Sequence, residues 1–203
     1  PGGGGIDTLP SGPNNPDTVD PKVKASDLAL YAYPTEFNFS VTKISAADKQ
    51  KNTVVLTQKK WATINNNSDG TDTTDPVKLH QRDFQSPRVQ VGRLYTTDWK
   101  VSAEVTPFTN GQKSLIGASI NIAKATEYTS DPKGKVAAKS KFKIEADGAT
   151  VTTDILKADP EARFMSDLKW DTDKVTLEFP GSVIDTGNYS STITWTLSGT
   201  PDV

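Results

Sequence analysis

Apolar side chains recur at every second residue in many short segments of this chain. The clearest example is near the end, where Ile193, Trp195 and Leu197 alternate with threonines. A period of two is typical of a β-strand with one buried face, because successive side chains of a strand point to opposite faces. β-Branched residues favour the pleated conformation, and Gly199 with Pro201 would end the strand. We therefore predict a final strand with one apolar face and one hydroxyl-bearing face.

The same alternation predicts further strands after residue 27. These segments are 28–30, 37–41, 54–56, 89–91, 99–105, 116–122, 142–144 and 175–179. Asn110-Gly111 is a tight-turn signal, so we expect 99–107 and 115–123 to form a hairpin. Residues 154–168 have only weak helical spacing and contain Pro160, so at most one or two short helical turns are expected there.

No pattern of long helices alternates with these strands, and we find no internal repeat. The chain is therefore predicted to be all-β and mainly antiparallel, as a β-sandwich or flattened barrel with long loops. Residues 1–26 are rich in glycine and proline and have little to bury, which predicts a disordered or extended leader before a β domain at 27–203. Residues 65–76 are polar and turn-prone, which is typical of a long surface loop.

The composition excludes several classes of function. Among 203 residues, 23 are basic and 25 acidic, giving a net charge of −2, whereas nucleic-acid binding usually needs a basic surplus on one face. No apolar run approaches the roughly 20 residues that span a bilayer, so we expect no membrane insertion. The absence of cysteine excludes disulfides, thiolate metal sites and cysteine nucleophiles.

No motif for catalysis, metal binding or a cofactor stands out. His80 is the only histidine, and its neighbours supply neither a serine triad nor a zinc site. Asp69, Asp72 and Asp75 could offer oxygen ligands to calcium, but they lack the standard spacing and a closing glutamate, so an ordinary solvated loop is the simpler interpretation. Carboxylate pairs of the glycosidase kind cannot be identified, because no sequence pattern sets their separation. We expect no enzyme.

Aromatic and basic residues are the remaining candidates for binding. Trp99 and Trp195 lie on apolar faces, where burial is the usual explanation. Trp61 precedes the polar loop, so it is a candidate surface contact that could stack on a sugar ring, or it packs locally. Lys139, Lys141 and Lys143 form the basic face of a strand. This basic face would attract an anionic polymer, or it protects an edge strand from aggregation.

The end of the chain resembles the signature of WxL-domain surface proteins of low-GC Gram-positive bacteria. The residues that match in place are Tyr189, Ile193, Thr194, Trp195, Leu197 and Pro201. The family carries a second, upstream WxL motif, and Trp99-Lys100-Val101 is similar to it, with valine in place of leucine. The resemblance extends over about residues 27–203.

This resemblance implies a secreted protein that is held non-covalently at the cell surface. It implies peptidoglycan or an associated wall polymer as the ligand, and it suggests assembly with a membrane-anchored WxL-interacting protein. Binding to the wall is therefore our main hypothesis, and a protein–protein assembly function is the alternative. The motif residues are binding candidates, although the alternation also predicts that Trp195 and Leu197 point inward, where they would close the fold.

Overall fold

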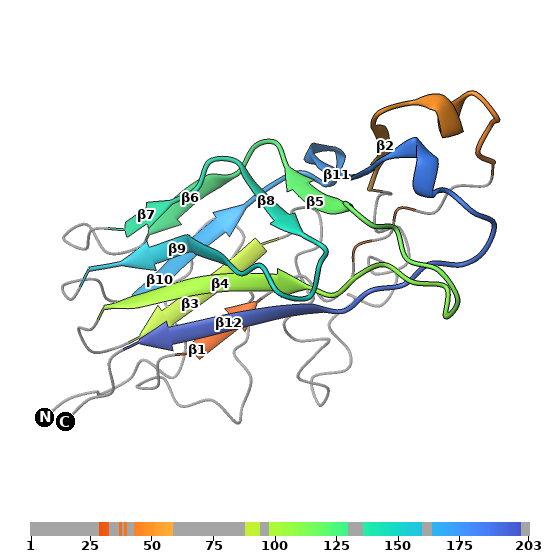
Figure 1. Ribbon diagram of the computed structural model, residues 1–203. Helices are drawn as coiled ribbons and strands as arrows, with labels where there is room; N and C mark the ends of the chain where they lie inside the picture. Colours follow the sequence, from red (N-terminus) through yellow and green to blue (C-terminus); the bar gives the residue numbers. More distant parts are fainter. Residues whose placement is uncertain are drawn as a thin grey trace, which may run out of the picture.

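A computed structural model of the chain describes residues 29–32, 37, 39, 43–58, 88–93, 98–129, 136–159 and 164–199. Within these ranges the secondary structure consists of strands and short 3-10 helices (Figure 1). The strands are β1 (Ala29–Ala32), β2 (Val54–Thr57), β3 (Arg88–Arg93), β4 (Trp99–Val105), β5 (Ser119–Ile122), β6 (Thr126–Thr129), β7 (Val136–Ala138), β8 (Phe142–Glu145), β9 (Thr152–Ala158), β10 (Phe164–Lys169), β11 (Val175–Phe179) and β12 (Ile193–Gly199). The 3-10 helices are η1 (Asp48–Gln50), η2 (Thr172–Lys174) and η3 (Gly181–Val183).

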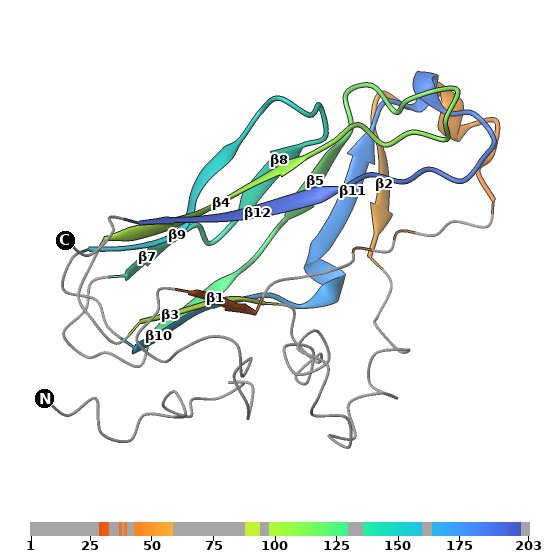
Figure 2. The same cartoon turned by 90° about the horizontal axis from the view of Figure 1, so that it is seen from below.

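The strands form three antiparallel sheets of four strands each. Sheet A has the order β1-β3-β10-β6, sheet B the order β2-β11-β5-β8, and sheet C the order β12-β4-β9-β7. Sheets A and B make one continuous layer, because β5 leads directly into β6 and η2 joins β10 to β11. Sheet C forms the opposite layer (Figure 2). The predicted all-β, antiparallel, sandwich-like fold is confirmed.

The core lies between the two layers and follows the alternation seen in the sequence. Trp99, Val101, Ala103 and Val105 of β4 are all buried, and the residues between them are exposed or half-buried. β11 repeats this pattern from the opposite layer with Val175, Leu177 and Phe179. Burial of such side chains contributes roughly 1.5–3 kcal/mol each, so these facing rows supply much of the stabilisation of the sandwich.

The predicted hairpin of 99–107 with 115–123 is wrong. β4 pairs with β12 and β9 in sheet C, whereas β5 pairs with β11 and β8 in sheet B. The turn signal itself is real, but it closes only a small bridge between Thr109 and Ser114. An alternating pattern specifies which face of a strand is buried, but it does not specify the neighbouring strand. Two consecutive strands can therefore belong to opposite layers.

The weak helical spacing within 154–168 does not mark a helix in the described parts of that segment, which belong to β9 and β10. Ile155 and Leu156 are adjacent in sequence and both are fully buried, which a regular strand does not allow. A bulge explains the difference. The register of β9 shifts between the partners of Val101 and Ala103, and Asp154 adopts a φ of +52°.

Several predictions concern residues outside those that the structure describes. They are the leader 1–26, the loop 65–76, Trp61, His80 and Pro201. In the described part of the chain, no helix has the length and apolar character needed to cross a membrane.

Two hydrogen-bonded turns hold strongly acidic carboxylates at the surface. Asp48 accepts hydrogen bonds from Lys51 Nζ at 2.7 Å and from the backbone N–H and hydroxyl of Ser45 at 2.8 Å, and these lower its pKa to about 2. Asp147 accepts from the hydroxyl and N–H of Thr150 and from the N–H of Ala149, which also lowers its pKa to about 2. Both turns therefore prefer the ionised carboxylate.

The segment after β11 packs closely on η1 through a single glycine. Gly181 donates its N–H to the carbonyl oxygen of Lys51 at 3.0 Å. A Cβ atom at this position would clash with the carbonyl oxygen of Asp48 and lie 2.7 Å from that of Lys51. Both obstacles are backbone atoms, which cannot move aside as a flexible side chain could. Only glycine therefore allows η3 to pack on η1 in this way.

Gly181→Ala is expected to lower the free energy of unfolding by at least about 2 kcal/mol, because η1 and η3 must separate to admit the methyl group. Gly111→Ala is the matched control. Its Cβ has open space around it but its φ is +89°, so backbone strain alone should cost about 1 kcal/mol. Urea unfolding measures both variants, and equal losses would contradict the clash.

Acid is expected to destabilise the fold between about pH 4 and pH 2. The carboxyl pKa of Asp48 and Asp147 is lower in the folded than in the unfolded chain, so their stabilisation is complete above about pH 4 and disappears as the pH falls through about 2. Melting temperatures of the double variant Asp48→Asn with Asp147→Asn should show a shallower acid decline than wild type. Asp171→Asn, an exposed control, should leave the decline unchanged; an equal effect there would refute the assignment.

Candidate functional site

The two tryptophan motifs of the sequence lie side by side as antiparallel partners. β12 pairs with β4 along its full length, and the register places Leu197 directly opposite Val101. The third residues of the two motifs therefore form a cross-strand pair. Because the strands are antiparallel, Trp195 and Trp99 lie on either side of this pair, two residues away in opposite directions.

Each tryptophan lies opposite a small residue on the neighbouring strand. Trp195 is opposite Ala103, and Trp99 lies between Gly199 of β12 and Ala158 of β9. Directly opposed side chains share one face of a sheet, and their Cβ atoms are only about 5 Å apart. Small partners therefore leave room for the indole rings on the inner face of sheet C.

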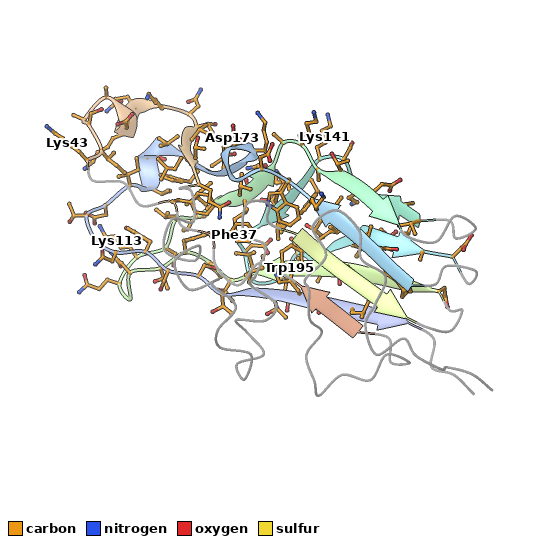
Figure 3. The ribbon with its side chains drawn as sticks, turned by 180° about the vertical axis from the view of Figure 1, so that it is seen from behind. Phe37, Lys43, Lys113, Lys141, Asp173 and Trp195 are labelled. Atoms are coloured by element: carbon orange, nitrogen blue, oxygen red, sulfur yellow. The ribbon has the colours of Figure 1, made fainter. Side chains whose placement is uncertain are left out.

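Trp195 also joins the two layers. Its ring stacks on that of Trp170, with centroids 6.4 Å apart and planes inclined by 27°. Trp170 follows β10 in the opposite layer and meets Phe142 edge-on at 6.0 Å. Aromatic pairs of this geometry contribute about 0.5–1.5 kcal/mol beyond the area they bury. Figure 3 shows Trp195 inside the molecule between the layers.

The motif residues differ in exposure. Trp99 and Val101 are buried, Ile193, Trp195, Leu197 and Tyr189 are half-buried, and Thr194 is exposed on the outer face of β12. The residues that contact the core therefore alternate with a hydroxyl-bearing outer face, as the pattern of the last strand predicted.

The lysines singled out by the sequence lie on or beside β8. Lys139, Lys141 and Lys143 are all exposed. Lys143 is 2.6 Å from Glu145 Oε1, and this contact raises the pKa of its ammonium group. Lys143 is thus already paired, whereas Lys139 and Lys141 make no ion pair with the described residues.

A groove of about 670 Å³ lies between the layers beside the start of β12. Its volume is in the range of sites that bind small molecules or single units of a polymer. Apolar side chains from both layers line most of it, and they include Leu56, Val105, Ile120, Leu177, Phe179 and Ile193. The remaining lining comes from three connecting segments. The one between β4 and β5 contributes Phe108 and Leu115, and the other two supply an aromatic pair and the polar groups.

The first of these segments contributes a pair of aromatic rings. Phe37 and Phe39 are stacked, with centroids 6.4 Å apart and planes inclined by only 12°. Phe37 is half-buried at the groove and Phe39 is buried (Figure 3). The sequence pattern predicted both as core residues, and the period of two places both on the same face of the chain.

The second segment, residues 184–192, supplies a polar rim. Asn188, Ser190, Ser191 and Thr192 offer amide and hydroxyl groups, and Asp185 offers the single carboxylate of the described lining. Lys113 donates a hydrogen bond to Asp185, and this contact, with the N–H of Thr186, lowers the pKa of Asp185. Since the ammonium group compensates the carboxylate, the described rim carries no net charge.

Tyr189 also lines the groove. Its hydroxyl oxygen is buried but has no hydrogen-bond partner. The backbone around it is fixed, because Ser190 and Thr109 exchange two N–H···O bonds of 2.9 and 3.0 Å. An unpaired buried hydroxyl costs about 1–3 kcal/mol. A ligand that supplied a polar atom here would recover this cost.

This arrangement suits a neutral ligand with both apolar faces and polar substituents. Aromatic rings can lie against C–H faces, while amides and hydroxyls bind polar groups at the edge. Within the described residues, no cluster of three or more His, Asp or Glu side chains could hold a metal ion. The sequence motif identified Tyr189 and Ile193, but it gave no signal for the groove itself, which forms from segments far apart in the chain.

Comparison with known protein families identified a match. A family model described as WxL domain surface cell wall-binding matches residues 2–201. No curated protein and no solved structure matches the chain significantly.

Trp195→Ala is expected to lower the free energy of unfolding by about 2–4 kcal/mol, since it removes a half-buried ring and its stack on Trp170. Trp195→Phe should recover part of this loss. Thr196→Ala, on the exposed face of the same strand, is the control and should change stability by less than about 0.5 kcal/mol. Chemical denaturation measures all three, and a Trp195→Ala variant as stable as Thr196→Ala would exclude a packing role.

Proposed function

The chain belongs to the WxL domain family of surface cell wall-binding domains, and we propose that peptidoglycan is the wall component to which it attaches non-covalently. As a member of this family it is a non-catalytic module of the cell surface. The observation that supports a specific site is the groove beside Tyr189. Tyr189, whose buried hydroxyl has no protein partner, lines this groove together with aromatic and neutral polar residues.

The chemistry of peptidoglycan glycan strands fits this groove. Their pyranose rings have apolar C–H faces, and their hydroxyl and acetamido groups are uncharged donors and acceptors. In the proposed complex, a sugar ring lies against Phe37 or Phe108, and one of its polar substituents pairs with the hydroxyl of Tyr189. The compensated charge of Asp185 agrees with a neutral ligand, because an uncompensated carboxylate would repel the acidic groups of the wall.

The motif residues on β4 and β12 have a supporting role in this proposal. Their packing fixes the start of β12, and Tyr189 lies only four residues before Ile193. Thr106 and Thr192 strengthen the connection, since Thr106 donates its N–H to Thr192 O at 2.9 Å and its hydroxyl accepts from Thr192 N–H at 2.8 Å. The strand pair therefore positions one wall of the groove.

Tyr189→Phe separates binding from folding. Because the hydroxyl has no partner in the free protein, its removal should leave the melting temperature unchanged or slightly higher. Affinity for purified peptidoglycan should fall about tenfold, as expected for the loss of one hydrogen bond worth ~1.4 kcal/mol. Thr194→Ala, on the exposed face of β12, is the control and should bind like wild type.

A sedimentation assay with purified, insoluble peptidoglycan provides the measurement. Wild-type protein left wholly in the supernatant would refute peptidoglycan as the ligand. Tight binding to a membrane-anchored WxL-interacting protein, without wall binding, would instead support the assembly function. If Tyr189→Phe and wild type sedimented equally, the groove would not be the binding site.

A further inference from the structure

Two turns and a 3-10 helix meet at one end of sheet B. The bend between β5 and β6 lies against the turn between β7 and β8, where Ala125 N–H donates to Ser140 O at 2.7 Å. On its other side, Ala123 N–H donates to Lys174 O of η2 at 2.8 Å. Segments that are far apart in sequence thus form one continuous surface.

This surface carries a group of lysines that the sequence did not bring together. Lys124 belongs to the bend, and Lys139 and Lys141 flank Ser140 in the facing turn. All three are exposed, and none forms an ion pair with a residue in the described ranges. We call Lys124, Lys139 and Lys141 the lysine cluster.

The neighbouring charges do not neutralise the lysine cluster directly. Lys174 is 3.8 Å from Asp173, and Lys143 is 2.6 Å from Glu145, so these two acids already have partners. Asp171 and Glu127 are exposed nearby along the chain but form no ion pair with the cluster. Figure 3 shows Lys141 and Asp173 along the same edge of the molecule, away from Phe37 at the groove.

The outer face of sheet B is polarised along its strands. Cross-strand register places Glu145 and Glu178 on either side of Ser119, whereas one pair further Lys143 and Thr176 flank Asn121. The lysine cluster lies beyond this second row, at the end away from the glutamates. Three ammonium groups without ion-pair partners among the described residues lie at one end, and they attract an extended anion by a screened, salt-dependent interaction.

We propose that the lysine cluster is a second wall contact, which binds the phosphate groups of a phosphodiester-linked polyol polymer attached to the wall. This inference rests on the wall-binding function proposed above, but it concerns a different surface and a ligand of opposite chemistry. The groove takes a neutral glycan, whereas the cluster takes a polyanion. Two separate contacts with one wall raise the effective affinity, because binding at the first increases the local concentration of the second ligand.

The test uses the variant Lys124→Gln, Lys139→Gln, Lys141→Gln and a control with the same change in charge, Lys43→Gln, Lys49→Gln, Lys100→Gln, whose lysines are exposed elsewhere. Purified poly(glycerol phosphate) is titrated at several salt concentrations. The cluster variant should bind at least tenfold more weakly at low salt. The slope of log affinity against log salt should decrease by about 2, as for the loss of three contacts to a flexible polyphosphate.

Wall preparations distinguish this inference from the groove. Hydrofluoric acid removes phosphodiester polymers and leaves peptidoglycan, so the cluster variant should bind treated wall like wild type and untreated wall more weakly. Tyr189→Phe should bind both preparations more weakly than wild type. Equal losses in the control and cluster variants, or wild-type binding to phosphatidylglycerol vesicles without binding to poly(glycerol phosphate), would overturn the second contact. If wild-type protein bound untreated wall but not treated wall, the proposed binding of peptidoglycan in the groove would be refuted.

Discussion

Two tryptophans can face one core from neighbouring strands only when each has a small residue beside it. In this domain the pairing of β4 with β12 satisfies that condition, since Ala103 lies opposite Trp195 and Gly199 opposite Trp99. A slip of one residue would turn every inner side chain of β12 toward solvent and its threonines toward the core. The register of this strand pair is therefore strongly fixed, and the stack of Trp195 on Trp170 ties it to the opposite layer.

Alternation in the sequence predicted most of the described strands, because they bury only one face, but it gave no signal for β6, β7, β9 or β10. Prediction failed where the backbone departs from a regular strand. Ile155 and Leu156 are both buried because of a bulge at Asp154. Two adjacent apolar residues also occur in the pattern of an amphipathic helix, so the sequence could not distinguish the two. The pairing of the strands could not be predicted either, because the apolar face of β5 would be buried equally well in either layer. The tryptophan motifs could be found from sequence, but their direct opposition could not.

The candidate site escaped prediction for a related reason. The groove forms where side chains from both layers meet three connecting segments, and no local pattern encodes such a meeting. Phe37 and Phe39 are two residues apart, as core residues of a strand are. Residues that line a groove have the same spacing, so the pattern does not distinguish the two. Only Tyr189 and Ile193 gave a signal, through the motif. The lysine cluster shows the same limit, since the hydrogen bond from Ala125 to Ser140 adds Lys124 to it while the ion pair with Glu145 removes Lys143.

A family signature need not coincide with the residues that touch a ligand. Here Trp99, Val101, Trp195 and Leu197 face the space between the layers, whereas Tyr189 and Ile193 of the same signature line the groove. The pairing of β12 with β4 connects these two groups of residues. Because β12 cannot slide along β4, the segment just before it is held in one position, and the Ser190–Thr109 bridge fixes it from the other side. Tyr189 is thereby held at the groove with its hydroxyl unpaired, and this preorganisation lowers the entropy that binding must overcome.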